Sequence, residues 1–581
     1  MRKTKILATI GPTSNDVEII RTMIGTGLDA ARINFSHGTY ESHTETINKI
    51  KAARESMNSP VPIVLDTKGP EIRIKTFRDD KVYLVQNSTF TLTTDDVEGD
   101  VDIVSVTYKD LPMDVRAGSR ILLDDGLIEL LVQSITDTDV VCKVVNEGYL
   151  GSRKGVNIPD VFVNLPSLTE QDVDDLKFGI EMGIDWVAAS FIRTAGDVLN
   201  IREVLETNDG GGIKIIAKIE SREGVDNIDS ILEVADGIMV ARGDLGVEIP
   251  PEEVPMVQKA LIQRANLLGK LVITATHMLE SMTKNPRPTR AEANDVANAI
   301  FDGTDVVMLS GETANGDYPV ESISMMARIA EKAENSPQYF NEIVHSRMKN
   351  FTNAISFAAC DTAKVLHASC IVAVTDSGFA ANMVARARPE SPILALTTIE
   401  QVCRQLNLTW GCKPMLVDEI SGNDEVFDVV EEMALKSGLA KIGDAIVALA
   451  GVPIGIAATT NTLKVRVVGN VLAKGKAKSG RGAVKGIARV FKVQEETDHF
   501  FERGDILVAT TTSDDMMEYI KKAGALVVGS WEQVDTGHAE TVAKALDIPL
   551  IVSYEKVVDL IGEGVAVTVD CDEGFVFNGY R

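Results

Sequence analysis

Four charged residues in the first half of the sequence have the chemistry needed to handle a phosphate group. Arg32 and Lys218 are cations, and an arginine can bind two phosphate oxygens at once. Glu220 and Asp244 are carboxylates, and two carboxylates suffice for one Mg²⁺, which keeps waters and substrate oxygens as its other ligands. Phosphoryl transfer depends mostly on positioned positive charge. These residues therefore predict metal-assisted transfer of a phosphoryl group.

A second group of residues offers oxygen atoms without strong cations between them. It consists of Asn34, Ser36, Asp66 and Thr67. Neutral and anionic oxygens in this mixture suit a second, monovalent metal ion. Gly243 has no side chain, so backbone N–H groups beside it could meet an anion.

Short apolar runs precede most of these residues and predict the elements that position them. Near-continuous hydrophobicity is typical of parallel strands buried on both faces, and amphipathic helical stretches fill the gaps. The runs are Ile6–Ile10, Ala30–Phe35, Pro62–Leu65, Trp186–Phe191, Ile213–Ile219, Gly237–Val240, Leu271–Ala275 and Asp305–Leu309. Eight such strand–helix units predict a (β/α)8 TIM barrel. Active sites of these barrels lie at the C-terminal ends of the strands, where the residues above fall.

The predicted fold class is α/β, and the rest of the sequence predicts three domains besides the barrel. Val/Thr/Asp-rich strands and turns indicate an inserted all-β domain, and the basic, Gly-rich stretch 474–482 is typical of a linker. The predicted domains are a (β/α)8 barrel over 1–69 and 169–337, an inserted β-barrel domain over 70–168, an α/β domain over 338–470, and an extra, swivelling-type C-terminal domain over 475–581.

Composition excludes several classes of function. The 581 residues contain 58 Lys and Arg against 85 Asp and Glu, a net charge of −27, which disfavours nucleic-acid binding. The longest apolar run, 445–458, contains Pro453 and predicts buried core, not a membrane span. The six cysteines form no C-x-x-C pair, so we expect reduced thiols in the cytoplasm.

Eight longer motifs resemble those of the pyruvate kinase family. They are RINFSHG, LDTKGPEIR, GSRKGVNIP, AKIES, ARGDLG, TATHMLESM, NPRPTRAE and MLSGETANG. The resemblance spans about residues 1–470 and implies a catalytic barrel, an inserted lid and an α/β regulatory domain. It implies phosphate transfer from phosphoenolpyruvate to ADP, giving pyruvate and ATP in glycolysis. It also implies Mg²⁺ or Mn²⁺ and K⁺ as cofactors, an allosteric small-molecule effector and a cytoplasmic homotetramer.

The resemblance implies a role for each matching residue. Arg32, Lys218 and Thr276 are implied to be catalytic, with Thr276 near the proton delivered to the enolate. The implied sets are Arg32, Lys218, Gly243, Asp244 and Thr276 for substrate; Asn34, His37, Arg73 and Lys154 for nucleotide; Glu220 and Asp244 for Mg²⁺; and Asn34, Ser36, Asp66 and Thr67 for K⁺.

Two places depart from the family pattern. His277 stands where glutamine is common in the family, and we expect it to perturb the site little. The segment 375–380 matches a loop that binds phosphorylated sugars in the family, yet it contains no basic residue. A fructose bisphosphate site is therefore not expected there, whereas a site for AMP or a sugar monophosphate stays open.

The C-terminal region resembles the phosphohistidine domain of phosphoenolpyruvate-utilising enzymes. The resemblance rests on Thr536–Ala539, although Gly537 replaces the usual serine. Glu540 adds negative charge beside His538, and a carboxylate disfavours a phosphoryl acceptor. We therefore favour a docked accessory domain over a phosphocarrier.

Two alternative functions remain open from the sequence. One is a catalytically idle metabolite sensor on the same fold, against which the complete set of charged residues argues. The other is a dikinase-like transfer through a phosphorylated His538. Trp410 and Trp531 are expected to pack in the interior instead of stacking on a nucleotide.

Overall fold

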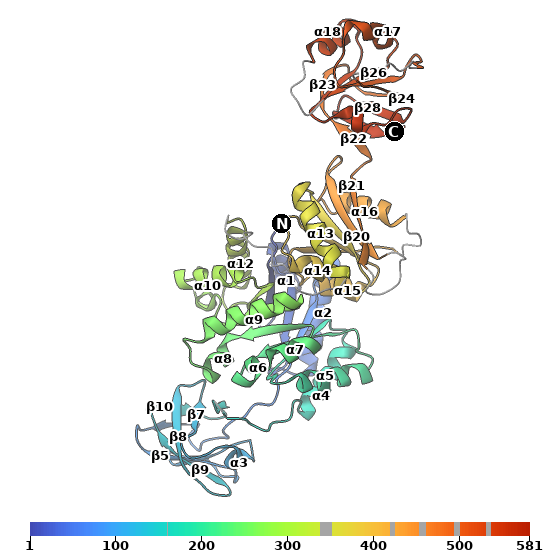
Figure 1. The fold of residues 1–581 in the computed structure, drawn as a ribbon. Helices are drawn as coiled ribbons and strands as arrows, with labels where there is room; N and C mark the ends of the chain where they lie inside the picture. The colour runs from blue at the N-terminus through green and yellow to red at the C-terminus, as the bar shows by residue number, and fades with distance from the viewer. Residues whose placement is uncertain are drawn as a thin grey trace. The chain divides into compact units, whose positions relative to one another are not determined.

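The computed structural model of the protein (Figure 1) describes residues 1–159, 161–336, 351–418, 425–451, 460–492, 500–529 and 536–580. Trp531 lies outside these ranges. The chain divides into two compact units. The first consists of Met1–Asn353 with Thr375–Asp418, and the second of Ala354–Val374 with Glu419–Arg581.

The first unit contains the predicted (β/α)8 barrel. Its strands are β1 (Lys5–Thr9), β2 (Ala30–Asn34), β3 (Ile63–Asp66), β12 (Trp186–Ala189), β13 (Lys214–Ile219), β14 (Gly237–Ala241), β15 (Leu271–Ala275) and β16 (Val306–Leu309). They close in the order β1-β16-β15-β14-β13-β12-β3-β2, and each paired neighbour is parallel. Most strand residues are fully buried, which is why the sequence shows them as continuous apolar runs.

Helices separate the barrel strands along the chain. They are α1 (Val17–Thr26), α2 (Tyr40–Ser56), α4 (Glu170–Glu181), α5 (Ala195–Thr207), α6 (Arg222–Asp226), α7 (Ile228–Val234), α8 (Arg242–Glu248), α9 (Val254–Leu268), η1 (Glu280–Thr283), α10 (Arg290–Phe301), α11 (Gly311–Ala314) and α12 (Pro319–Glu334). Thr39, Thr169, Thr194 and Thr289 each begin a helix with a capping box. Each box satisfies backbone N–H groups that the first helical turn leaves unpaired.

Two hydrophobic clusters stabilise the barrel. The larger one fills the space between strands and helices, and includes Ile6, Ile47 and Leu176. The smaller one fills the interior of the barrel and includes Leu7, Ile216 and Leu408. Leu408 follows α15 (Glu400–Leu406) in the segment Thr375–Asp418, which also contains α14 (Phe379–Arg386) and the parallel strands β18 (Ile393–Thr397) and β19 (Cys412–Leu416).

The inserted β domain follows β3. Its elements are β4 (Lys81–Leu84), β5 (Thr89–Thr93), β6 (Ile103–Ser105), α3 (Leu111–Asp114), β7 (Arg120–Leu123), β8 (Ile128–Ile135), β9 (Asp139–Val144), β10 (Gly148–Gly151) and β11 (Val156–Asn157). They form a two-stranded sheet, β10-β4, and a six-stranded sheet, β11-β7-β8-β9-β5-β6. Buried and accessible residues alternate along β4 and β9, which identifies sheets with one face on a core.

The second unit contains α/β elements from before and after the segment Thr375–Asp418. These are most of α13 (Phe351–Val365), β17 (Cys370–Val374), α16 (Glu425–Lys436), β20 (Ala445–Gly451) and β21 (Thr460–Val467). β20 pairs in parallel with β17 and antiparallel with β21. The mixture of parallel strands and helices agrees with the predicted α/β class.

The C-terminal elements correct one prediction. They are β22 (Val471–Lys474), β23 (Lys476–Ser479), β24 (Ala483–Phe491), β25 (Ile506–Ala509), η2 (Asp514–Met516), α17 (Met517–Ile520), β26 (Ala525–Gly529), α18 (Gly537–Leu546), β27 (Leu550–Ser553), α19 (Val557–Leu560), β28 (Ala566–Asp570) and β29 (Phe575–Asn578). The stretch 474–482 was predicted to be a linker, and this is wrong. β22 pairs with β29 and β23 with β27, so both belong to the eight-stranded C-terminal sheet.

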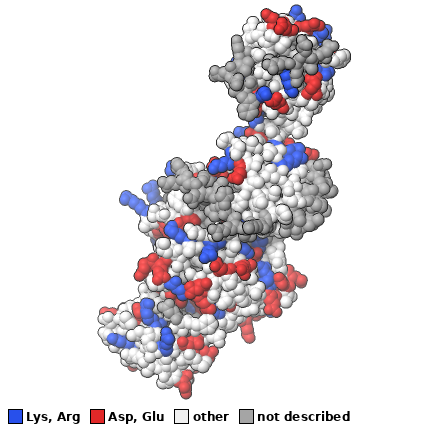
Figure 2. All heavy atoms as spheres, in the orientation of Figure 1, with Lys and Arg blue, Asp and Glu red and all other residues white. Residues whose placement is uncertain are grey.

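The surface and the cysteines agree with the composition. Figure 2 shows acidic side chains spread over this face with Lys and Arg between them. All six cysteines are buried free thiols. Within the described residues, no helix combines the length and apolar character that crossing a membrane requires.

Candidate active site

A network of ion pairs links four of the predicted residues, Arg32, Asp66, Lys218 and Glu220, at the C-terminal ends of the barrel strands. Asp66 ends β3, and its Oδ2 lies 2.6 Å from Nε of Arg32. Its Oδ1 lies 3.2 Å from Nζ of Lys218, which also lies 3.0 Å from Oε1 of Glu220. Arg32, Asp66 and Glu220 are buried. Two cations and two carboxylates thus share one small, desolvated volume.

The electrostatics of this ion-pair network favour the charged form of Lys218. Burial would raise the pKa of Asp66, but the charges of Arg32 and Lys218 outweigh burial and hold that pKa below its ordinary value. Burial would lower the pKa of Lys218, but Asp66 and Glu220 raise it. Burial raises the pKa of Glu220 to about 7 although Lys218 opposes the shift. The site therefore holds fixed positive charge beside Glu220, whose negative charge Lys218 offsets only in part.

Three further residues complete this chain, and the sequence analysis missed them. Ser190 accepts a 2.6 Å hydrogen bond from Nζ of Lys218 and donates to the backbone oxygen of Thr67. The backbone N–H of Phe191 donates to Oε2 of Glu220 at 2.6 Å. Oγ1 of Thr9 accepts from Nη1 of Arg32 at 2.7 Å. All three residues lie at or just after the end of β1 or β12, and this position at a strand end could have identified them from the sequence.

Gly243 and Thr276 contact each other directly. The backbone N–H of Gly243, in the first turn of α8, donates to Oγ1 of Thr276 at 2.8 Å. That hydroxyl donates to the oxygen of Ala275 at 2.7 Å. Thr276 and His277 have φ values of 65° and 54°, in the left-handed region. A β-branched residue there stores about 1–3 kcal/mol of strain, and such strain concentrates at functional sites.

A cavity of about 560 Å³ opens between the barrel and the inserted domain. Glu220 and Asp244 line it from the barrel, whereas Asn157 and Phe162 line it from the insert. Burial raises the pKa of Asp244 although Lys218 opposes the shift. The volume of the cavity is in the range of about 300–1,000 Å³ that is typical of small-molecule sites.

The donor set of this cavity fits a hard divalent cation. No group of three or more His, Cys, Asp or Glu side chains in the described ranges could hold a metal on its own. Glu220 and Asp244 follow the neighbouring strands β13 and β14 and line the same cavity. Two carboxylates suffice for Mg²⁺, which keeps waters and substrate oxygens in its shell.

The residues predicted to hold a monovalent cation come from two neighbouring strands. Asn34 on β2 lies in register with Asp66 on β3. Oδ1 of Asn34 accepts from the N–H of Ser36 at 3.1 Å, and Oγ1 of Thr67 accepts from the N–H of Ser190. Each side-chain oxygen keeps a lone pair for a metal ion. The oxygens therefore fit such a site.

The predicted nucleotide residues come from two regions. Arg73 bridges Gly155 in the backbone, which brings it beside Lys154. The guanidinium of Arg73 donates to Glu71 at 2.7 and 2.9 Å and to the backbone oxygen of Arg153 at 2.8 Å. Nζ of Lys154 lies 2.9 Å from Asp124. His37 is exposed after β2. Within the described residues, no contact joins His37 to Arg73 or Lys154.

Comparison with known proteins identifies the family. The model of the pyruvate kinase barrel domain matches residues 1–323, and that of the pyruvate kinase alpha/beta domain matches 353–466. The chain is 48% identical over 585 residues to the pyruvate kinase of Geobacillus stearothermophilus, covering 100% of this chain and 99% of the relative. The chain belongs to the pyruvate kinase family. Its function is that of a pyruvate kinase, phosphate transfer between phosphoenolpyruvate and ADP in glycolysis.

Other pyruvate kinases and one further domain model agree. The pyruvate kinase of Bacillus licheniformis is 47% identical over 585 residues, again 100% of this chain and 99% of the relative. The crystal structure of a pyruvate kinase from Cryptosporidium parvum matches with a TM-score of 0.77 and 39% identity, over 80% of this chain and 96% of that chain. The mobile domain of phosphoenolpyruvate-utilising enzymes matches residues 501–574.

In this pyruvate kinase family member, the ring of His538 is engaged on both sides. Nδ1 lies 2.8 Å from Oγ1 of Thr512, and Nε2 lies 3.2 Å from Oδ1 of Asp514. Glu540 instead pairs with Lys478 at 3.1 Å. The predicted neighbouring carboxylate is therefore neutralised by a lysine, while a second carboxylate, Asp514, faces the ring.

Proposed function

We propose that this chain transfers the phosphoryl group of phosphoenolpyruvate to ADP, giving pyruvate and ATP in the cytoplasm. The bond between phosphorus and the enol oxygen breaks, a bond to a β-phosphate oxygen of ADP forms, and the enolate takes up a proton at its methylene carbon. The observation that carries this proposal is the buried chain Arg32–Asp66–Lys218–Glu220 at the C-terminal end of the barrel.

Arg32 and Lys218 act on the negative charge of the reaction. Arg32 binds the phosphate of phosphoenolpyruvate, and Lys218 stabilises the transferring phosphoryl group and the enolate. Asp66 and Ser190 orient the ammonium of Lys218 through contacts of 3.2 and 2.6 Å. Because these cations are already positioned in a desolvated site, stabilisation of the transfer state requires little reorganisation.

Glu220 and Asp244 are proposed to hold Mg²⁺ or Mn²⁺, and Asn34, Ser36, Asp66 and Thr67 to hold K⁺. When bound, these ions neutralise the charge on the phosphate and carboxylate oxygens of the reactants. The divalent assignment is supported by two carboxylates on one cavity wall, and the monovalent one by the register of Asn34 with Asp66.

Gly243, Asp244 and Thr276 are proposed to seat the substrate carboxylate. The hydroxyl of Thr276 is fixed between the N–H of Gly243 and the oxygen of Ala275. It therefore has one defined direction from which a proton can be relayed to the enolate. Asn34, His37, Arg73 and Lys154 are proposed to face the nucleotide, the last two after exchanging their present carboxylate partners for phosphate.

The proposed domains are the barrel (1–69 and 169–337), the lid (70–168), the regulatory domain (338–470) and a C-terminal domain whose start we move to Val471, because β22 belongs to its sheet. A homotetramer with an allosteric effector is proposed from the family resemblance.

The test is a coupled assay of pyruvate formation with ADP and Mg²⁺. We expect turnover in the full chain and its loss in Arg32→Met and Glu220→Gln. Labelled phosphoenolpyruvate, with His538→Ala as the control, tests transfer through histidine. Label retained on His538 during turnover, or no pyruvate from the folded full chain, would contradict the proposal.

A further inference from the structure

The turn that carries Thr276 lies at the C-terminal end of β15, beside the start of α8. β14 and β15 end in register, with Ala241 opposite Ala275. Arg242 and Gly243 follow the first of these strands, and Thr276 follows the second. Thr276 has a φ of 65°, a left-handed conformation that is unfavourable for a β-branched residue. Such a conformation persists only where the surrounding structure holds it in place.

The side chain of Arg242, which is 11% exposed, binds this turn at two points. Its Nη2 donates to the backbone oxygen of Thr276 at 2.6 Å, and its Nε donates to that of Ala275 at 3.2 Å. Nε and Nη2 lie along one edge of the planar guanidinium, so the two hydrogen bonds form a fork. Successive carbonyl groups of an extended strand point to opposite sides, so one edge can reach both oxygens only where the backbone turns. The fork therefore favours the left-handed conformation of Thr276.

The contacts of the Thr276 hydroxyl depend on the same fork. The N–H of Gly243 donates to Oγ1 of Thr276 at 2.8 Å. This hydroxyl donates to the backbone oxygen of Ala275 at 2.7 Å, which is the oxygen that Nε of Arg242 also binds. A carbonyl oxygen has two lone pairs and can accept from both donors. The direction of the Thr276 hydroxyl therefore depends on where Arg242 holds the Ala275 carbonyl.

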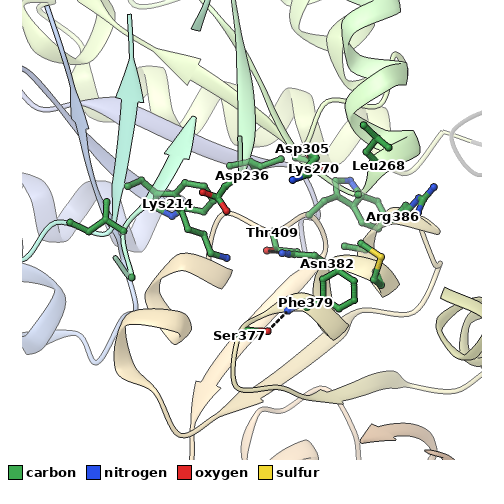
Figure 3. A pocket seen from close by; sticks show the side chains of 18 of the residues that line it. Lys214, Asp236, Leu268, Lys270, Asp305, Ser377, Phe379, Asn382, Arg386 and Thr409 are labelled. Carbon is green, nitrogen blue, oxygen red and sulfur yellow. Dashed lines mark hydrogen bonds between the residues drawn. The ribbon is translucent and has the colours of Figure 1, made fainter. Parts of the chain in front are cut away.

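An arginine at the opposite end of the barrel has a different task. Figure 3 shows a cavity of about 490 Å³ at that end, lined in part by Asp236. Asp236 lies 2.6 Å from Arg202 and accepts the backbone N–H of Ile215, so this pair fixes the start of a strand. Arg242 also has a carboxylate partner, because its Nη1 lies 2.8 Å from Asp295 on α10. Its Nε and Nη2, however, hold the turn at the active-site end.

We propose that Arg242 is a positioning residue for the proton transfer of the reaction, an inference that rests on the proposed function. The enolate left by phosphoryl transfer takes up the proton of the Thr276 hydroxyl at its methylene carbon. A C–H bond forms there, the enolate oxygen becomes the ketone oxygen of pyruvate, and the hydroxyl regains a proton from solvent. Arg242 acts through Thr276. It keeps the hydroxyl on one face of the enolate, so that the proton is added to that face before the enolate can leave.

Turnover in ²H₂O of phosphoenolpyruvate that carries tritium at one methylene position tests this role. Addition to one face gives a methyl group of a single handedness, which we expect from the full chain. Arg242→Met should lower kcat by roughly tenfold or more, because charge-assisted hydrogen bonds are lost. It should also give a largely racemic methyl group, since enolpyruvate then leaves and is protonated in solution on either face. Asp295→Asn is the matched control. It breaks the ion pair of Arg242 but leaves both carbonyl contacts, so it should keep the handedness.

Two results would overturn the proposal. One is a methyl group of single handedness from Arg242→Met, and the other is a racemic one from Asp295→Asn. If Arg242→Met fails to fold, Arg242→Lys replaces it, since lysine keeps the charge beside Asp295 but has no fork for two oxygens. A partial loss of handedness is then expected, and full retention would count against the role of Arg242.

Failure of the proposed function gives a different result, because the folded full chain would then form no pyruvate. Titration with oxalate in the presence of Mg²⁺ tests Arg242 even in that case, since oxalate is a planar dicarboxylate that resembles the enolate. Arg242→Met should weaken oxalate binding by roughly threefold or more, the size of one lost hydrogen bond. Equal affinity of the variant and the parent would contradict the positioning of Thr276 by Arg242.

Discussion

The two ends of the barrel use the same residue types in different ways. At the N-terminal end, aspartates directly precede four of the strands, β2, β12, β14 and β16. They are Asp29, Asp185, Asp236 and Asp305. Each accepts a backbone N–H from the neighbouring strand, from Ile6, Ile63, Ile215 and Val272 respectively. Each also pairs with an arginine, Arg2, Arg404, Arg202 and Arg388 respectively. Asp29 and Asp185 each have a second cation at 3.8 Å, Lys5 and Arg54.

At the C-terminal end, by contrast, two carboxylates share one cation. Asp66 contacts both Arg32 and Lys218, and Lys218 contacts Glu220 as well. Left-handed backbone at Phe191 and Thr276 adds strain here. At the N-terminal end, aspartates with arginine partners of their own hold the strands in register. At the C-terminal end, the charges shared between Asp66, Lys218 and Glu220 can be redistributed when an anionic substrate enters. Pairing, more than residue type, therefore separates stability from chemistry in this barrel.

The largest expected effect is at the C-terminal end. Lys218→Met should lower kcat by roughly 10²–10³-fold, because the ammonium stabilises charge that develops in transfer. KM for phosphoenolpyruvate should change little. Steady-state pyruvate formation measures both constants. Equal losses in binding and turnover would sink this role.

The next effect concerns the shared carboxylate. With tetramethylammonium as the only monovalent cation, turnover should be at least about tenfold slower than with K⁺, since a loss of about 1.4 kcal/mol already has that size. Without K⁺, Asp66 would repel the substrate phosphate. Equal rates in the two buffers would rule out the K⁺ site.

A substitution at Glu71 tests whether a side-chain cation can replace K⁺. Glu71 lines the cavity with Asp244 and pairs with Arg73. Glu71→Lys should reduce the dependence on K⁺, because the side chain would supply positive charge in place of the ion. Glu71→Gln removes the pair with Arg73 without adding a cation, so it should keep the dependence. The ratio of rates with and without K⁺ is the measurement.

A change at the N-terminal end should affect stability instead of turnover. Asp185→Asn leaves Arg404 without its buried partner, and breaking such a pair costs on the order of 3–5 kcal/mol. We expect a lower thermal midpoint and an almost unchanged kcat. Asp174→Asn, on an exposed pair with Lys177, is the matched control and should shift the midpoint little. A lower kcat at an unchanged midpoint would contradict a purely stabilising role for Asp185.

The smallest effect is expected from removal of the C-terminal domain. The cut belongs after Gly469, between β21 and β22, because a cut at Lys474 would leave β22 without its sheet. The truncated chain should keep kcat within about twofold, since no proposed active-site residue lies beyond it. Thermal stability and effector response are free to change. A folded but inactive truncation would refute this.

The barrel was predictable because strands buried on both faces appear as continuous apolar runs. The charged site residues were predictable because barrel chemistry lies at strand ends. Ser190 was missed because its single hydroxyl follows an apolar run without a charged neighbour. The aspartates before the strands were missed because their partners, such as Arg404 for Asp185, are remote in sequence. The linker prediction failed because β22 and β23 are the edge strands of their sheet, and edge strands often carry lysine.

The pairing of β1 with β16 has a consequence for biosynthesis. Lys5 of β1 pairs with Val306 of β16, about 300 residues later in the chain. At a synthesis rate of about 5–20 residues per second, the outer edge of β1 waits roughly 15–60 s for its partner to be made. The inserted β domain, which lies within this interval, has its own core and can fold during the wait. The nascent chain therefore presents an open strand edge for about half of its synthesis, which is when we expect it to depend most on chaperones.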